Sequence, residues 1–163
     1  MNKRRAFIVG IKSTQLLKKE KNFLKKYKPW GVILFTRNIK NIEQTFKLTS
    51  SIRKIFNDKK YPILIDQEGG RVNRLKNIIS FDNLTSEFFG KKYIKNIKEF
   101  KLYYKLFIDK TSFLLKSIGV NVNTSPVLDL RVKGSSNIIG NRSFSKNPKI
   151  VSKIGDFCID YFH

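Results

Sequence analysis

Residues 61–75 read YPILIDQEGGRVNRL, and this stretch changes abruptly from apolar to polar. Its first half contains the continuous apolar run Ile63–Ile65, which is typical of a strand buried on both faces of a sheet. The polar run DQE (66–68) follows at once, and the two glycines after it permit backbone dihedrals that other residues avoid. Parallel α/β folds place their binding sites at the carboxyl ends of such strands. The pattern therefore fits a binding site, and it fits equally well a polar loop in which Asp66 is a turn residue.

Patterns on either side of this strand alternate between strand and helix. Short apolar runs predict further strands at residues 6–11, 31–36 and 120–130, in addition to the strand at 61–65. Apolar residues at helical spacing predict helices at residues 13–27, 41–57, 96–118 and 147–163, and a short helix within the loop 78–93. Strands this apolar, joined by helices, predict an α/β fold with a parallel sheet. No linker or repeat interrupts the pattern, so we expect residues 1–163 to belong to one domain.

Residues with helix-capping side chains set the expected ends of these helices. Ser13 or Thr14 is expected to begin the first helix, and Asn41 the second, with Gln44 in the capping-box position. The remaining helix ends are expected at Asn57-Asp58, at Gly119 and at Asn147-Pro148.

The net charge of +22, from 34 Lys and Arg against 12 Asp and Glu, suggests a polyanionic partner. However, the lysines are spread through every segment, and the sequence is equally rich in Asn, Ile and Phe. An AT-rich genome produces this joint bias without any nucleic-acid function. We therefore expect no specific nucleic-acid partner.

Cysteine content and the first residues indicate the compartment. Cys158 is the only cysteine, which excludes an intrachain disulfide and a cysteine-based metal site, and its apolar surroundings predict a small core residue. The start MNKRRAFIVGI (1–11) imitates a signal peptide, but its apolar run is too short and no cleavage site follows. No stretch approaches the roughly 20 apolar residues of a membrane span. We expect a cytoplasmic protein without a membrane partner.

The chain stops inside an apolar helical pattern. Residues 157–162 read FCIDYF, and His163, the only histidine, follows without a glycine or a polar tail. Apolar residues at a free terminus normally need further chain to cover them. We expect that the sequence is cut short.

Four stretches together resemble family 3 glycoside hydrolases, in particular the bacterial β-N-acetylhexosaminidases that recycle cell-wall muropeptides. The resemblance is most specific at DQEGGRVNR (66–74). Three further stretches match, in order, the family's second strand, its fourth strand and the loop and helix start after it: GVILFTRN (31–38), SPVLDL (125–130) and GNRSFSKNP (140–148). The resemblance implies a (β/α)₈ TIM-type barrel, of which this truncated chain holds the N-terminal half, about the first four βα units.

By this resemblance, Asp66 binds sugar hydroxyls, and Arg74 and Arg142 contact the same sugar. Pyranose hydroxyls suit carboxylate and bidentate guanidinium partners, because charge-assisted hydrogen bonds are the stronger ones. Three further residues fit a supporting position around the site as well as a direct contact with the sugar: Glu68, Arg71 and Asp129.

The resemblance implies retaining hydrolysis of terminal β-linked N-acetylglucosamine, without a metal or organic cofactor. The implied partner is a small saccharide, an N-acetylglucosaminyl muropeptide. In the family, the general acid/base follows a Lys-His pair on the next strand, and the nucleophilic aspartate lies near the seventh strand. Neither motif is present in these 163 residues. We therefore assign no catalytic residue, His163 included, and expect the chain by itself to be inactive.

Two other functions stay open. An exo-acting β-glucosidase of the same family would share the fold, although DQEGGRVNR favours the hexosaminidase branch. A non-catalytic basic module that binds polyanions or sugars would be favoured by lysines confined to one face, whereas here they are scattered. The sequence does not define the oligomeric state.

Overall fold

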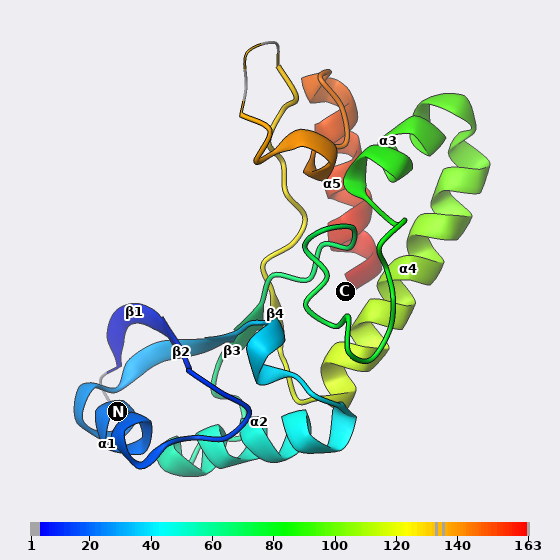
Figure 1. Ribbon diagram of the computed structural model, residues 1–163. Coiled ribbons are helices and arrows are strands. Elements are labelled where there is room, and N and C mark those ends of the chain that lie inside the picture. The colour runs from blue at the N-terminus through cyan, green and yellow to red at the C-terminus, as the bar shows by residue number, and fades with distance from the viewer. Residues whose placement is uncertain (1–3, 133, 135, 163) are drawn as a thin grey trace. The chain divides into compact units, whose positions relative to one another are not determined.

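A computed structural model describes residues 4–132, 134 and 136–162, and His163 lies outside this described part (Figure 1). Contacts divide the described chain into two compact units. The first unit comprises residues 4–66, 74–80 and 114–124, and the second comprises residues 67–73, 81–113 and the described residues from 125 onward.

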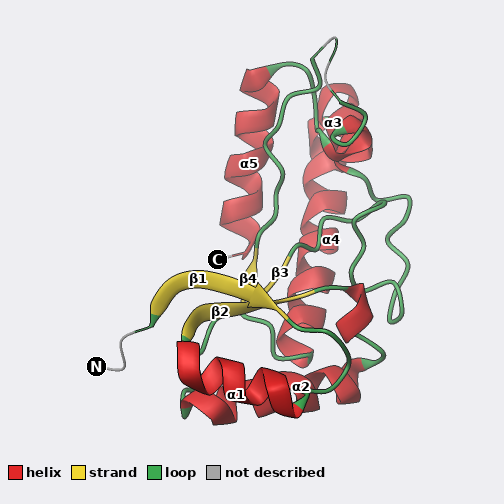
Figure 2. Ribbon diagram, turned by 60° about the vertical axis from the view of Figure 1, so that its left-hand side comes forward, coloured by secondary structure: helices red, strands yellow, loops and turns green. Residues whose placement is uncertain are grey.

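The first unit is built on a four-stranded parallel sheet, which confirms the predicted α/β class. Its strands are β1 (Arg5–Gly10), β2 (Pro29–Leu34), β3 (Ile63–Ile65) and β4 (Val122–Asn123), paired in that order. The helices α1 (Lys18–Tyr27) and α2 (Ile42–Phe56) lie on one side of it, and the short 3₁₀ turn η1 (Thr36–Asn38) follows β2 (Figure 2).

Burial in this unit is concentrated at the centre of the sheet. Ile63 and Ile65 of β3 and Val32 of β2 have no exposed surface, and Ile52 packs from the inner face of α2. The edge strand β1 is less buried than the central strands, since Ile8 is 45% exposed. The reason is that β1 pairs only with β2 within the described part of the chain.

The predicted start of the first helix is wrong. α1 begins at Lys18 rather than at Ser13 or Thr14. The carboxylate of Glu20 accepts hydrogen bonds from the backbone N–H groups of Lys12 (2.7 Å) and Leu17 (2.8 Å), and these bonds hold the preceding segment outside the helix.

The other predicted caps are confirmed. Asn41 Oδ1 accepts from the Gln44 N–H (2.8 Å), whereas Gln44 Oε1 accepts from the Lys40 N–H (2.8 Å) and not, as a capping box requires, from the Asn41 N–H. Asn57 ends α2 in the left-handed conformation with a φ of 48°. Gly119, with a φ of 73°, follows the helix α4 (Ile97–Ser117). The last helix, α5 (Pro148–Phe162), begins directly after Asn147.

The fourth strand is much shorter than the predicted range 120–130. It pairs with β3 at Val122 and Asn123, and the Thr124 N–H donates one more bond to the Ile65 carbonyl (2.8 Å). Residues 125–130 have no regular structure, and Pro126 has no N–H with which to continue the ladder.

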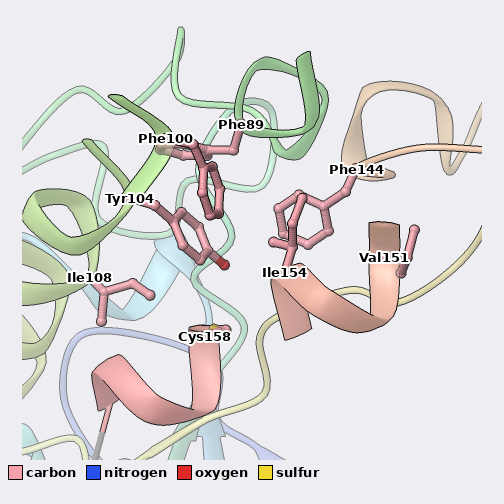
Figure 3. Packing of buried hydrophobic residues seen from close by; sticks show 8 residues of the cluster. All are labelled: Phe89, Phe100, Tyr104, Ile108, Phe144, Val151, Ile154 and Cys158. Atoms are coloured by element: carbon pink, nitrogen blue, oxygen red, sulfur yellow. The ribbon is translucent and has the colours of Figure 1, made fainter. Parts of the chain in front are cut away.

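The second unit has a helical core (Figure 3). Side chains from α3 (Ser86–Lys95), residues 97–113 of α4, and α5 pack into one cluster with a residue of the preceding loop: Phe89, Phe100, Tyr104, Ile108, Phe144, Val151, Ile154 and Cys158. Cys158 is thus a core residue, as predicted. Its thiol and the Tyr104 hydroxyl are hydrogen-bonded, and burial raises the pKa of both groups. Among the described helices, none is long and apolar enough to cross a membrane.

Two residues of α4 test this packing. Ile108 has no exposed surface, whereas Leu106 is 56% exposed. We predict that Ile108→Ala lowers the free energy of unfolding by about 2–5 kcal/mol, because it leaves a cavity in the core. Leu106→Ala should change it by less than about 0.5 kcal/mol. Urea titrations of both variants decide the point, and equal losses would contradict the described packing.

Candidate functional site

In the first unit, Asp66 and Arg74 form a bidentate ion pair just after β3. Arg74 Nε donates to Asp66 Oδ1 at 2.7 Å, and Arg74 Nη2 donates to Oδ2 at 2.5 Å. Both side chains keep about a quarter of their surface exposed, 25% for Asp66 and 26% for Arg74. A carboxylate has about four lone-pair sites, so the two oxygens can still accept further hydrogen bonds. The Asp66 carboxylate is therefore held in place by Arg74 and is still accessible to a ligand.

Aromatic and cationic side chains lie beside this pair. The guanidinium carbon of Arg74 lies 5.5 Å from the ring centre of Phe35, and that of Arg37 lies 4.5 Å from the same ring. Arg37 Nε also donates to the Ile11 carbonyl at 3.0 Å. Phe35 thus contributes to the orientation of Arg74 through its π face.

The glycine pair makes a tight turn in the second unit. Residues 67–73, here called the glycine turn, close on themselves through bonds from the Glu68 N–H to the Val72 carbonyl (3.1 Å) and from the Val72 N–H to the Gly69 carbonyl (3.2 Å). Gly69 has a φ of 88°, and a Cβ there would lie 2.3 Å from the Leu84 carbonyl oxygen. Only glycine fits this position.

A second bidentate ion pair joins Glu68 of the glycine turn to Arg142. Arg142 Nε donates to Glu68 Oε2 at 2.8 Å, and Arg142 Nη2 donates to Oε1 at 2.7 Å. The Glu68 side chain is only 5% exposed, against 23% for Arg142. A carboxylate this deeply buried needs its cationic partner.

Arg71, also in the glycine turn, binds backbone rather than side chains. Its Nη2 donates to the carbonyl oxygens of Asn137 (2.7 Å) and Ile139 (3.0 Å), and also to that of Ile138.

Asp129 differs from the other candidates. Its side chain is exposed, and its carboxylate makes no hydrogen bond or ion pair with the described residues. Its backbone carbonyl accepts from Ser143 Oγ at 2.7 Å, so the following loop is anchored here by main chain.

The structure thus brings the predicted residues together in two sets. Asp66 pairs with Arg74 in the first unit, and Glu68, Arg71 and Arg142 gather in the second.

Sequence reasoning missed Asn38, which is fully buried in η1 at the end of GVILFTRN. Its Nδ2 donates to the carbonyls of Ile11 (3.1 Å) and Ser13 (2.9 Å), and its Oδ1 accepts from the Phe35 N–H (2.9 Å). One amide thereby ties together the loops after β1 and β2. An asparagine two residues after the apolar run ILFT was the available signal.

The burial of Glu68 yields a prediction about stability. Arg142→Met leaves a buried carboxylate unpaired, and we predict a loss of about 3–5 kcal/mol in the free energy of unfolding. The matched control is Arg131→Met, which removes an exposed ion pair with Glu87 and should cost less than about 1 kcal/mol.

A double-mutant cycle isolates the pair. In Glu68→Gln/Arg142→Met no buried charge remains, so part of the lost stability should return. Equal effects of Arg142→Met and Arg131→Met in denaturant titrations would show that Glu68 does not depend on Arg142.

Comparisons with known proteins identify the family of this chain. Residues 8–163 match the glycosyl hydrolase family 3 N terminal domain. The beta-hexosaminidase of Hydrogenovibrio crunogenus is 38% identical over 149 residues, which are 91% of this chain and 41% of that protein. The beta-hexosaminidase of Thioalkalivibrio sulfidiphilus is 30% identical over 148 residues, which are 90% of this chain and 42% of that protein.

A solved structure agrees with these matches. Native NagZ from Neisseria gonorrhoeae aligns with a TM-score of 0.85 at 28% identity, over 98% of this chain and 46% of that chain. The same enzyme has been solved in complex with N-trifluoroacetyl-D-glucosamine, with a TM-score of 0.84. The chain spans less than half the length of each of these relatives. Since the family domain covers nearly every residue and the fold agrees, this protein belongs to glycosyl hydrolase family 3.

Proposed function

We propose that this chain is the sugar-binding part of a β-N-acetylhexosaminidase that releases terminal β-linked N-acetylglucosamine from peptidoglycan-derived muropeptides in the cytoplasm. The relatives named beta-hexosaminidase and the NagZ complex with an N-acylated glucosamine support the substrate class. The observation that carries the proposal is the bidentate pair of Asp66 and Arg74, which presents a fixed carboxylate at the carboxyl end of a buried parallel strand.

In this proposal Asp66 accepts hydrogen bonds from two sugar hydroxyls. The side-on contact with Arg74 fixes the plane of the carboxylate, and a rigid acceptor suits hydroxyl groups that are themselves fixed on a ring. The guanidinium of Arg74 supplies further donors to the same sugar, because an arginine side chain carries five N–H groups.

In the second unit, Arg142 is proposed as a cationic contact for sugar hydroxyls. Its bidentate bonds to Glu68 hold the guanidinium in one orientation before any ligand arrives. Such preorganisation lowers the entropy lost on binding. Glu68 and Arg71 then act as supports for Arg142, and Asp129 anchors the loop through its main chain.

The proposed reaction is retaining hydrolysis through a covalent glycosyl-enzyme. That mechanism needs a carboxylate nucleophile and a general acid/base. The family motifs for both groups are absent from these 163 residues, which align with less than half of each relative. We therefore assign sugar binding, and no chemical step, to this chain.

Loss of the Asp66 charge tests the binding site. We predict that Asp66→Asn weakens the binding of N-acetylglucosamine at least about tenfold, since hydrogen bonds to a charged group contribute about 1.5–3 kcal/mol. Asp58→Asn is the matched control, because Asp58 also forms an ion pair, with Arg4, in the same unit. Calorimetry or ligand-observed NMR measures both.

Two outcomes would contradict the proposal. One is an equal loss of affinity in Asp58→Asn and Asp66→Asn. The other is binding of glucose as tight as that of N-acetylglucosamine, which would favour the β-glucosidase alternative.

The chain by itself should not hydrolyse a chromogenic β-N-acetylglucosaminide. Removal of a catalytic group lowers the rate by orders of magnitude, and here both groups lack their motifs. Turnover above the uncatalysed rate, in a preparation shown to be free of other glycosidases, would overturn the assignment of sugar binding without chemistry.

A further inference from the structure

Two arginines connect the glycine turn with the loop 136–146 in opposite directions. Arg71 extends from the turn to the carbonyls of residues 137–139, and Arg142 extends from the loop back to Glu68 on the turn. All of these residues belong to the second unit. The two contacts therefore depend on the same pair of segments.

The two arginines also share acceptors. The Ile139 carbonyl accepts from Arg71 Nη2 at 3.0 Å and from the Arg142 backbone N–H at 2.8 Å, and the second bond closes the turn η2 (Gly140–Arg142). The Ile138 carbonyl accepts from Arg71 Nη2 and from Arg142 Nη1, the latter at 3.4 Å. Arg71 thus binds the two peptide groups that hold both the backbone and the side chain of Arg142.

The backbone between these contacts passes directly beside the Arg71 guanidinium at Gly140. Gly140 has a φ of 44°, and a Cβ at this position would lie 3.4 Å from Arg71 Nη2. At Gly140 the chain therefore turns in a left-handed conformation next to the Arg71 guanidinium. Arg142 lies only two residues after this turn.

We propose that Arg71 is a positioning residue: it fixes the peptide groups of residues 137–139 and thereby sets the direction of the Arg142 guanidinium. Glu68 fixes the far end of the same side chain, so Arg142 is held at its backbone by Arg71 and at its head by Glu68. Arg71 acts through Arg142 and does not itself contact the sugar. The consequence for sugar affinity rests on the proposed function, whereas the effect on Arg142 does not.

The test uses the Nε–H NMR signal of Arg142 in the 163-residue chain without ligand. This proton lies in the 2.8 Å bond to Glu68, so it should exchange slowly with water in the wild-type protein. Arg71→Met keeps an aliphatic side chain but removes all the N–H donors of Arg71. Because Arg142 then loses its positioning contacts, the exchange rate of its Nε–H should rise about tenfold or more. Arg71→Lys keeps the charge and three donors, and should restore part of the protection.

Arg131→Met is the matched control. Arg131 precedes the same loop and pairs with Glu87 of α3, so the variant removes the same charge and the same donors from the same unit. In this control the Arg142 Nε–H should exchange with water as slowly as in the wild type. An exchange rate that is unchanged in both Arg71 variants would overturn the proposal. So would an equal rise of that rate in Arg131→Met.

Sugar titrations of the same variants separate this inference from the proposed function. Affinity for N-acetylglucosamine should fall roughly tenfold in Arg71→Met and less than about twofold in Arg131→Met. If the Arg142 signal responds as expected but wild-type protein binds no sugar, the proposed function is wrong and the positioning of Arg142 by Arg71 stands. If Arg71→Met does not fold, Arg71→Lys becomes the deciding variant. An Arg142 Nε–H that exchanges as slowly in Arg71→Lys as in the wild type would contradict a role for the guanidinium donors of Arg71.

Discussion

The pairing of β3 between β2 and β4 is the constraint on which the proposed site depends. The strand has three residues, and their exposed fractions are 0% for Ile63, 3% for Leu64 and 0% for Ile65. Burying such side chains stabilises each by about 1.5–3 kcal/mol, and the parallel ladder satisfies their backbone groups. Because the strand cannot shift without exposing them, the residue after it has a fixed place. That residue is Asp66.

Ion pairs with arginine then fix the orientation of the carboxylates that follow this strand. Asp66 and Glu68 each meet an arginine through two nearly parallel hydrogen bonds. The two pairs differ in burial, since Asp66 keeps 25% of its side-chain surface and Glu68 keeps 5%. This difference suits two tasks. The more accessible carboxylate can accept from a ligand, whereas the buried one holds its arginine in place.

Much of this could be predicted from the sequence where the cause is local. The apolar run at 63–65, the cap at Asn41 and the glycine at 119 each determine their own neighbourhood, and the structure confirms all three. The start of α1 at Lys18 was missed because the N-cap residue, Leu17, has no capping side chain. The Glu20 carboxylate caps this helix instead, by accepting from the Leu17 N–H in the capping-box manner and from the more distant Lys12 N–H. The exposure of β1 likewise follows from its place at the edge of the sheet, which its composition does not reveal.

The candidate site, too, could be predicted from the sequence only in part. The motif DQEGGRVNR indicated which residues to consider, but it did not show that Asp66 pairs with Arg74 or that Arg71 binds main chain. Glu68 and Arg142 lie 74 positions apart, so only the folded chain reveals their contact. Sequence identified the chemical groups, and long-range packing assigns each its partner.

The most direct test of the account is a crystal structure of this chain with N-acetylglucosamine. We expect both carboxylate oxygens of Asp66 to accept hydrogen bonds from ring hydroxyls at about 2.5–3.0 Å while the bidentate contact with Arg74 is kept. A sugar bound away from Asp66, or an Asp66 carboxylate that contacts only Arg74 in the complex, would contradict the claim that this ion pair is the core of a sugar site.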